Sequence, residues 1–533
     1  MHAITAAVAA FCLFAVPAAG AALRIVTPAT PALPEQFAAR ELARYLAAMG
    51  NPAPVVAASP APGDLYIGVL PSALPPAARQ ALASRLRGQD PDSFALHSFP
   101  GGLVILGNSP RAHLYGVYGY LESLGARWYF PGPENEIIPR AAARLDGYDT
   151  LEAPSFRKRG LCVFATTPGF AELADFAAKA RLNTIGLHTL PSLPPFGDAG
   201  YEAAAKAIGP RGLAIDIERH FFGERFCPDD RATLAREQAN FRRYIAALPA
   251  SMQDFFLWAA DKYLPPCRSP QYRDYTVSDI VLWFSNQMAA TLRETRPRGR
   301  FAFLAYLGTE EPPAHVKPAP GVFLEWAPIR QSFAHGIDDP ASATSRRYRE
   351  NFEAHLKLFN PAEAQVLGYW LDDTLFSRTH YGRLPYNPEA MRADLAWYHG
   401  RGVRAVTTFG VITGRDYFAS HASPAVFLYP LLLWDIHADP RAAVREFCRR
   451  YFGSAEASAI FDRLAEADRL VYVDDGNVQA ARANDPRFLR AASAAVDEAR
   501  RLMDAQTEPA LRARAARLVQ EAAARLAQIG RQL

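Results

Sequence analysis

The sequence has few cysteines, and none occurs in the close pairs that metal sites use. Five cysteines are spread over 533 residues, with no CxxC or HExxH spacing, which argues against a zinc site. Cys12 lies in an apolar N-terminal stretch, and the other four are far apart: Cys162, Cys227, Cys267 and Cys448. If the protein is exported from the cytoplasm, a disulfide between two of these cysteines is permitted but not required. Buried free thiols are the simpler expectation. We therefore expect no metal ion and no other cofactor.

The chain also lacks a strong excess of one charge and a long internal apolar run. Its 58 Lys and Arg against 54 Asp and Glu give a net charge of +4, without a basic run, so a nucleic-acid-binding surface is not indicated. No segment after the N-terminus is long and apolar enough to span a membrane. Residues 3–19 are apolar and residues 18–22 are small, which is typical of a signal peptide. We expect residues 1–21 to be that peptide and the mature protein to be periplasmic or secreted, with its oligomeric state left open.

Residues 22–150 combine strand and helix patterns. A Pro-Gly-Gly turn at residues 100–102 predicts a β-hairpin between two apolar runs. The expected strands cover residues 23–27, 64–70, 93–98 and 103–107, and the expected helices cover residues 36–49 and 111–124. This pattern predicts a small N-terminal α/β domain with a mixed sheet.

Residues 151–421 contain eight short apolar runs separated by helical stretches. The runs cover residues 159–164, 184–188, 213–218, 254–260, 301–307, 321–326, 365–371 and 403–409. This alternation predicts a closed parallel (β/α)8 TIM barrel. An open doubly wound sheet is the alternative, but it usually carries a glycine-rich phosphate turn after its first strand, and none is present here. Residues 422–533 are rich in Ala, Arg, Leu and Glu at helical spacing, which predicts a C-terminal helical domain.

Carboxylates, aromatic rings and cations gather where the expected barrel strands end, which is where such barrels carry their sites. The candidate catalytic acids are Asp261, Glu325, Asp372 and Asp373. The candidate substrate-binding residues are Arg159, His188, His220, Trp258, Tyr306, Trp326, Arg330, His335 and Trp370. Carbohydrate chemistry uses this mixture, because sugar C–H faces pack on aromatic rings, and glycosidic cleavage needs two carboxyl groups.

Each candidate also has a structural interpretation. Asp261 could cap the segment that follows it. Glu325 lies in an apolar run, where an ionisable group is costly unless it is paired or functional. Asp372 and Asp373 are adjacent, so on an extended chain only one of them would face the site. The histidines could be contacts rather than bases, and the tryptophans could be core residues.

Several stretches of the chain resemble known families. Residues 93–97, 102–122 and 125–132 resemble the N-terminal domain found ahead of barrels in hexosaminidases and α-glucuronidases. The chain is more closely similar to the bacterial family called domain of unknown function 4838. That similarity is carried by Phe255-Phe-Leu-Trp-Ala-Ala-Asp261, Asn286, Phe303-Leu-Ala-Tyr306 and Leu433-Trp434-Asp435.

The resemblance implies a glycoside-hydrolase-like barrel with Asp261 as the fourth-strand acid. It places Glu325 and one of the two adjacent aspartates as carboxylates of the sixth and seventh strands, and Arg159 where hexosaminidases hold a pair of sugar hydroxyls. Hexosaminidases carry an Asp-Glu pair at the fourth strand, whereas this chain has Asp261-Lys262. A mechanism assisted by the substrate's N-acetyl group is therefore not indicated.

The leading hypothesis is an exo-type glycoside hydrolase acting on an amino-sugar- or uronic-acid-containing poly- or oligosaccharide. Carboxylates at the barrel strand ends would supply acid and base. Two alternatives stay open. One is a non-catalytic glycan-binding barrel protein of a polysaccharide system, and the other is a polysaccharide deacetylase or lyase.

Overall fold

The computed structural model describes residues 22–57, 64–164, 167–188, 199–223, 226–372, 386–410, 423–471 and 486–530. The expected signal peptide and Asp373 lie outside the described residues. The chain forms two compact units, which are Met1–Ala126 with Ile138–Ala153, and Arg127–Ile137 with Pro154–Leu533. Division of the second unit into a barrel domain and a separate helical domain stays a prediction.

The first unit is an α/β fold built on one mixed six-stranded sheet of order β2-β1-β3-β5-β4-β8. The strands are β1 (Arg24–Val26), β2 (Val55–Ala57), β3 (Asp64–Ile67), β4 (Phe94–Phe99), β5 (Gly102–Gly107) and β8 (Asp149–Glu152). The helices are α1 (Leu33–Ala48), α2 (Pro76–Leu86) and α3 (Pro110–Ser123). The mixed sheet and the predicted β4–β5 hairpin, which pairs antiparallel, are confirmed.

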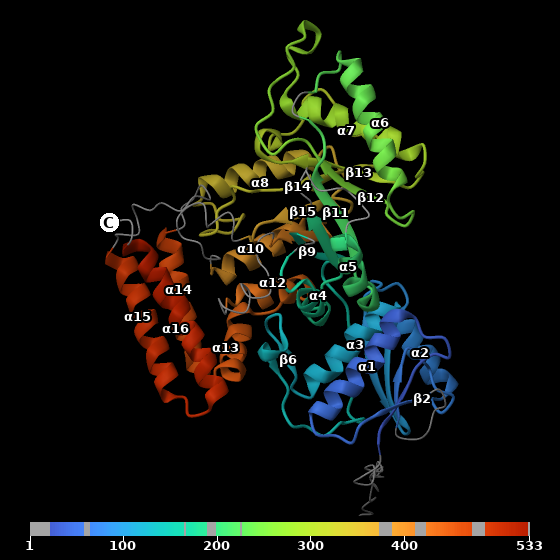
Figure 1. Cartoon of the computed structure of the whole chain (residues 1–533), viewed down its shortest axis with the longest axis vertical. Helices are drawn as coiled ribbons and strands as arrows, with labels where there is room; N and C mark the ends of the chain where they lie inside the picture. Colours follow the sequence, from blue (N-terminus) through green and yellow to red (C-terminus); the bar gives the residue numbers. More distant parts are fainter. Residues whose placement is uncertain are drawn as a thin grey trace, which may run out of the picture. The chain divides into compact units, whose positions relative to one another are not determined.

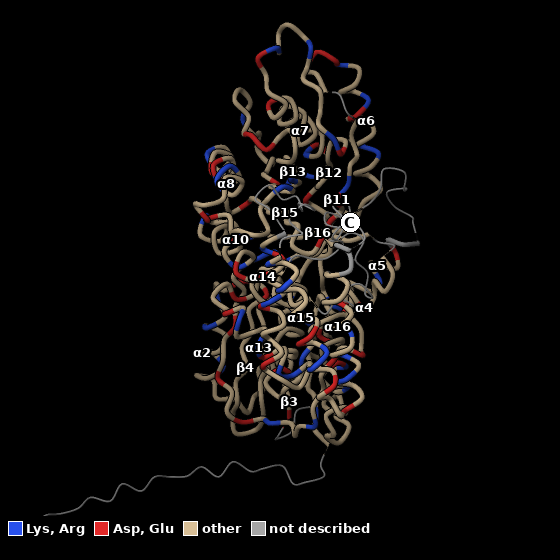
Figure 2. Tube along the Cα trace, turned by 90° about the vertical axis from the view of Figure 1, so that its left-hand side faces the viewer, with Lys and Arg blue, Asp and Glu red and all other residues tan. Residues whose placement is uncertain are grey.

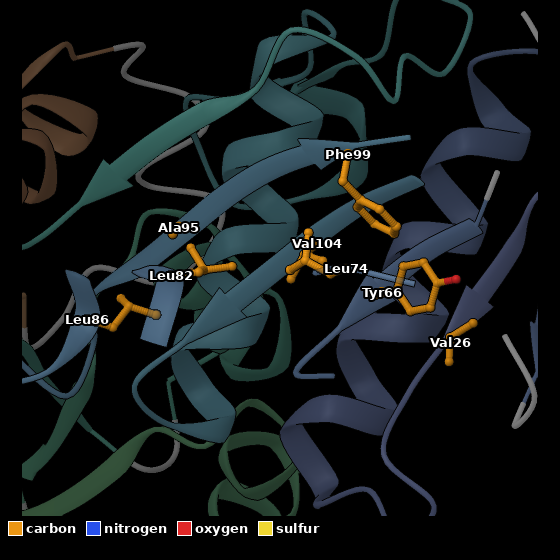
Figure 3. Close-up of a cluster of buried hydrophobic side chains, with 8 residues drawn as sticks. All are labelled: Val26, Tyr66, Leu74, Leu82, Leu86, Ala95, Phe99 and Val104. Carbon is orange, nitrogen blue, oxygen red and sulfur yellow. The ribbon is translucent and has the colours of Figure 1, made fainter. Parts of the chain in front are cut away.

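The hairpin turn depends on a glycine. Gly102 has a φ of +142°, and a Cβ there would lie 2.0 Å from the Asp64 carbonyl oxygen. Helix α2 was not anticipated from the sequence. It contributes Leu82 and Leu86 to a buried cluster with sheet residues that include Tyr66 and Val104 (Figure 3).

The second unit contains the predicted barrel, in which eight parallel strands close in the order β10-β11-β12-β13-β14-β15-β16-β9 (Figure 1). The strands are β9 (Lys158–Phe164), β10 (Thr184–His188), β11 (Ala214–His220), β12 (Asp254–Trp258), β13 (Arg300–Ala305), β14 (Val322–Trp326), β15 (Gln365–Gly368) and β16 (Ala405–Phe409). The intervening helices are α4 (Phe170–Lys179), α5 (Ala199–Ile208), α6 (Arg231–Ala246), α7 (Val277–Arg293), α8 (Ala343–His355) and α10 (Pro388–Gly400). Each of the eight expected strands is confirmed, and the doubly wound alternative is wrong.

Polar side chains fill the amino end of the barrel interior. Lys158 on β9 forms an ion pair with Asp216 on β11 and donates to the Gln365 side chain on β15 at 2.5 Å. Since β11 and β15 are not neighbours of β9, these contacts cross the lumen. Arg300 and Asp254 form a second pair. Strand alternation then fixes which later residues on each strand face inward.

The rest of the second unit is helical, apart from the short hairpin β6 (Arg127–Trp128) with β7 (Glu136–Ile137). The helices are α12 (Ala425–Trp434), α13 (Pro440–Tyr451), α14 (Ser458–Val471), α15 (Pro486–Ala505) and α16 (Pro509–Gly530). Acidic and basic residues are interspersed along these last helices (Figure 2). Among the described residues, we find no helix with the length and apolar character that crossing a membrane requires.

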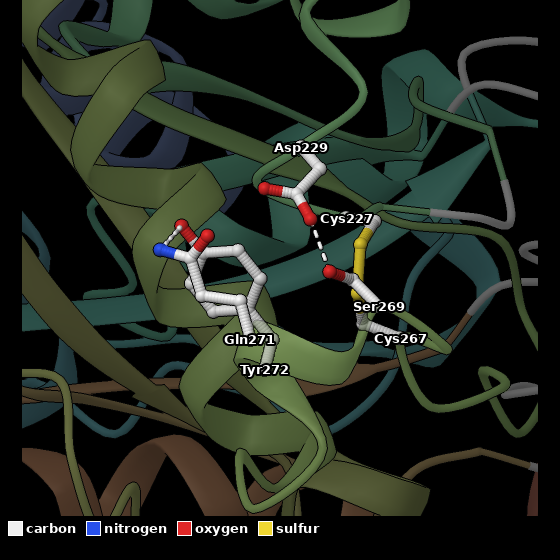
Figure 4. The surroundings of a disulfide bond; sticks show 6 residues. All are labelled: Cys227, Asp229, Cys267, Ser269, Gln271 and Tyr272. Carbon is white, nitrogen blue, oxygen red and sulfur yellow. Dashed lines mark hydrogen bonds between the residues drawn. A yellow bond between two sulfur atoms is a disulfide. The ribbon is translucent and has the colours of Figure 1, made fainter.

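The cysteines behave differently from the expectation. Cys227, after β11, and Cys267, after β12, form a disulfide, so the expectation of free thiols is wrong for both. The bond ties two consecutive βα loops together, and Ser269 and Asp229 add a hydrogen bond between the same loops (Figure 4). Cys162 and Cys448 are buried free thiols, as expected.

Candidate active site

Aromatic rings from several strands meet at the carboxyl end of the barrel. The ring of His188, at the end of β10, lies 5.8 Å from that of Trp258 on β12 and 5.5 Å from that of Phe409 on β16. His220, at the end of β11, lies 5.2 Å from Trp258. The structure therefore brings three of the predicted binding residues into one aromatic layer.

The His188 imidazole is neutral at physiological pH. Burial is the main reason that its pKa falls to about 4, and the nearby His220 lowers it further. The Asp261 carboxylate acts in the opposite direction, so Asp261 lies within electrostatic reach of the aromatic layer.

Asp261 is exposed and lies just past β12. Its Oδ1 accepts a hydrogen bond of 3.0 Å from the Tyr306 hydroxyl, which comes from the residue following β13. The turn after Tyr306 is fixed by Thr309, whose hydroxyl accepts from the Tyr306 amide at 2.9 Å and donates to the Leu304 carbonyl at 2.8 Å.

The same turn carries backbone strain. Leu307 has a φ of 47°, a left-handed conformation that is unusual for a residue with a Cβ and clusters at functional sites. The residue next to Tyr306 thus has a strained backbone within a turn that Thr309 fixes by hydrogen bonds.

Glu325 lies deeper in the lumen than the aromatic layer, and it is fully buried. Its carboxyl accepts from Trp258 Nε1 at 2.7 Å and from Gln365 Nε2 at 3.1 Å. Burial raises its pKa well above the ordinary value, and the nearby Glu218 carboxyl raises it further. At this position Glu325 anchors the Trp258 indole.

Glu218, on β11, is the main lumen residue that the candidate list missed. It is fully buried, and burial followed by the charge of Asp216 raises its pKa. A Cβ at Gly186 would lie 2.5 Å from its Oε1, so glycine at that position makes room for the carboxyl. The sequence could have identified Glu218, because it lies two residues before His220 on the same strand and therefore faces the same side of that strand.

Asp372 lies near Tyr369 at the carboxyl end of β15. Tyr369 stacks on Phe409 with ring centroids 5.4 Å apart. Burial raises the pKa of Tyr369 well above its ordinary value, and Tyr306 and Asp372 are the next largest causes. Tyr306 and Asp372 therefore both lie within electrostatic reach of Tyr369, and Asp372 is 5% exposed.

The structure places Arg159 at the opposite end of the barrel, so its expected role at the sugar site is wrong. It is fully buried near the amino end of β9. Its guanidinium donates to the carbonyls of Arg181 at 2.8 Å and Phe156 at 2.7 Å, and lies over the Trp434 ring. Arg159 therefore stabilises loops below the barrel.

Trp326 and Trp370 are also corrections, because both side chains point away from the lumen. Trp326 Nε1 donates to the Tyr398 hydroxyl at 3.2 Å, and Trp370 Nε1 donates to Asp394 Oδ2 at 3.2 Å. Both acceptors belong to α10. Since the residue before each tryptophan faces inward, alternation along the strand turns the indole toward the helices.

Arg330 and His335 both belong to the loop between β14 and α8. The Arg330 guanidinium is exposed and lies 5.7 Å from the centroid of the Tyr263 ring. His335 pairs with Asp339 within its own loop at 2.7 Å. No group of three His, Cys, Asp or Glu residues suited to a metal ion occurs in the part of the chain that the structure describes.

Comparison with known proteins agrees with this architecture. The family model of the domain of unknown function 4838 matches residues 265–463, and no curated protein matches the chain. The fold is similar to a GH138 enzyme targeting pectin rhamnogalacturonan II, with a TM-score of 0.60, 10% identity, and coverage of 95% of this chain and 69% of that one. It is also similar to a family GH115 4-O-methyl-α-glucuronidase with specificity for decorated arabinogalactans, with a TM-score of 0.62, 13% identity, and coverage of 96% and 72%.

A GH84 structure matches with a TM-score of 0.51 and 11% identity, covering 96% of this chain and 89% of that one. At these identities the matches establish the fold. The family model confirms the resemblance to the domain of unknown function 4838 over residues 265–463, and the chain shares its overall fold with these glycoside hydrolases.

Proposed function

We propose that this protein is an exo-type glycoside hydrolase acting on an amino-sugar- or uronic-acid-containing poly- or oligosaccharide, with Asp261 as the general acid. The observation that carries the proposal is the Asp261–Tyr306 pair at the barrel mouth, within electrostatic reach of His188. Tyr306 occupies one carboxyl oxygen, which leaves the other for the glycosidic oxygen of a bound sugar. Proton donation to that oxygen is the acid's part of the reaction.

The second carboxyl group is Asp372 or Asp373, acting as base or nucleophile. The choice of Asp372 is supported by its electrostatic effect on Tyr369, because Asp372 and Tyr306 both raise the pKa of that tyrosine. Glu325 is the less suitable choice because it is fully buried and is hydrogen-bonded to Trp258. We assign Glu325 the role of a positioning residue that fixes the indole.

The aromatic layer supplies the sugar-binding surface. Trp258 and the neutral His188 line this end of the barrel with packed rings, and His220 adds a ring whose Nδ1 contacts the Ala259 carbonyl at 2.5 Å. A site that combines apolar faces with a few fixed polar groups suits a carbohydrate.

We also propose that the protein acts in the periplasm or outside the cell. The disulfide between Cys227 and Cys267 supports this, because disulfides persist in oxidising compartments. The similarity to an enzyme targeting pectin rhamnogalacturonan II and to a glucuronidase with specificity for decorated arabinogalactans supports a polysaccharide substrate.

The test measures release of reducing sugar from a panel of uronic-acid and amino-sugar glycans by the wild type and two variants. Asp261→Asn is expected to lower the rate by roughly 10²- to 10⁴-fold, because the leaving group loses its proton donor. The matched control is Asp274→Asn, an exposed acid of the same loop, which should keep the wild-type rate. Equal rates for Asp261→Asn and wild type would refute the assignment, and glycan binding without any product would favour the non-catalytic alternative.

A further inference from the structure

An exposed aromatic ring lies beside the proposed acid. Among the described residues, Tyr263 is the one aromatic residue in the set of exposed large hydrophobic side chains, at 56% exposure. It follows Asp261 by two positions, on the loop after β12. Its loop lies at the carboxyl end of the barrel, where this fold carries its sites, so the ring is a candidate ligand contact.

The ring is held over the same turn that fixes the acid. A Cβ at Gly308 would lie 3.4 Å from Tyr263 Cδ1, so the ring packs along the turn after β13. Tyr306, two residues earlier in that turn, donates to Asp261. The strained Leu307 lies between these two contacts. The acid and the exposed ring therefore share one rigid support.

A cation from a third loop completes the arrangement. The Arg330 guanidinium lies 5.7 Å from the Tyr263 ring centroid, and no described carboxylate forms an ion pair with it. Arg401 provides a contrast. Its guanidinium lies 4.0 Å from the Trp397 ring and is paired with Glu353 at 2.7 Å. The N–H groups of the Arg330 guanidinium are thus available to an external anion, whereas those of Arg401 are engaged by Glu353.

We propose that Tyr263 and Arg330 form a subsite for a uronic acid unit of the substrate. The pyranose ring packs against the exposed part of the Tyr263 ring, and the sugar carboxylate accepts hydrogen bonds from the Arg330 guanidinium. A planar guanidinium binds a carboxylate with two parallel hydrogen bonds, whereas a neutral hexose offers only the ring contact. The proposal rests on the proposed function and narrows its substrate class to uronic-acid-containing glycans.

The experiment measures binding without turnover, on the full chain carrying Asp261→Asn. The probes are the α- and β-methyl glycosides of glucuronic and galacturonic acid, with the matched methyl glucosides and galactosides as neutral partners. Affinities are measured by NMR titration. At least one uronide is expected to bind roughly tenfold more tightly than its neutral partner, a difference typical of one charge-assisted contact.

Further substitutions in that background separate the two contacts. Arg330→Gln should reduce uronide affinity to that of the neutral sugar and leave the neutral sugar unchanged. Tyr263→Ala should weaken both probes roughly fivefold, as expected for loss of an aromatic contact, and Tyr263→Phe should not. Arg401→Gln is the matched control and should bind like the parent protein.

Three results would overturn the subsite. They are equal affinity for uronides and neutral sugars, no detectable binding of any uronide, and Arg330→Gln and Tyr263→Ala behaving like Arg401→Gln. The proposed function fails separately, when the wild type releases no sugar from any glycan while the binding differences remain. If the wild type cleaves glycans and the binding differences are missing, only the subsite is wrong.

Discussion

The sharpest stability prediction concerns Asp394, a fully buried acid on α10. Its Oδ1 accepts from the Ile337 amide at 2.7 Å, and its Oδ2 accepts from Trp370 Nε1 at 3.2 Å. It therefore ties the loop after β14 to the segment that leads into Asp372. Burial raises the pKa of Asp394 from 3.8 to about 8, against the opposing effect of these two hydrogen bonds.

The size of the effect follows from linkage. A carboxyl whose pKa is raised by folding makes the folded state less stable as pH rises from its unfolded pKa through its folded pKa. With values of 3.8 and about 8, ionisation of Asp394 costs about 2 kcal/mol at pH 5 and about 5 kcal/mol at pH 8. Asp394→Asn removes this cost. Its altered hydrogen bond to Trp370, worth about 1–3 kcal/mol, is the same at both pH values.

The free energy of unfolding of Asp394→Asn, relative to wild type, should therefore rise by about 3–4 kcal/mol from pH 5 to pH 8. Urea unfolding followed by tryptophan fluorescence measures it at the two pH values. Asp497→Asn, an exposed acid on α15, is the control and should show almost no pH-dependent difference. A relative stability that stays constant, or falls, between pH 5 and pH 8 would refute the assignment of a buried, high-pKa acid.

Three further predictions concern the disulfide, the strained turn and an outward tryptophan. Replacing Cys227 and Cys267 by Ser, which opens a loop of 40 residues, should cost about 4 kcal/mol, and an unchanged melting temperature would contradict the bond. Leu307→Gly should stabilise the protein by up to about 1 kcal/mol in urea unfolding, because relief of the left-handed strain exceeds the added chain entropy; a loss of stability would contradict this. Trp326→Phe should lose about 1–2 kcal/mol with its hydrogen bond to Tyr398 and leave glycan binding unchanged, so weaker binding would contradict its placement outside the lumen.

The barrel was predictable because each strand is a short apolar run between helical stretches. The run at residues 184–188 has the same bounds as β10, and β14 begins one residue after its expected start. Local pattern fixes such elements, since burial on both faces of a parallel strand demands apolar residues. The Pro-Gly-Gly hairpin was predictable for a similarly local reason.

The site was predictable only in part. His188, His220 and Trp258 end the three neighbouring strands β10, β11 and β12, and the parallel pairing of these strands brings them together. The outward direction of Trp326 also follows from alternation once Glu325 is placed inside. The prediction for Arg159 is wrong because this residue is the second of β9, five positions before the carboxyl end at which the site lies.

Other features depend on three-dimensional paths that local pattern does not encode. The bond between Cys227 and Cys267 requires two irregular loops to approach each other. The contact of Arg330 with Tyr263 likewise joins loops from non-adjacent strands. The deep position of Glu325 beneath Trp258 depends on the stagger of the barrel strands.

The most direct test of the central claim, that Asp261 protonates the leaving group, is the leaving-group dependence of hydrolysis by Asp261→Asn. Turnover is measured on a series of aryl glycosides whose phenol pKa values differ, using the glycone that the wild type cleaves. The account predicts that the variant loses roughly 10²- to 10⁴-fold on the most basic phenols and approaches the wild-type rate on dinitrophenol, which departs without a proton. An equal loss on every leaving group, or no loss on any, would contradict the role of Asp261 as the general acid.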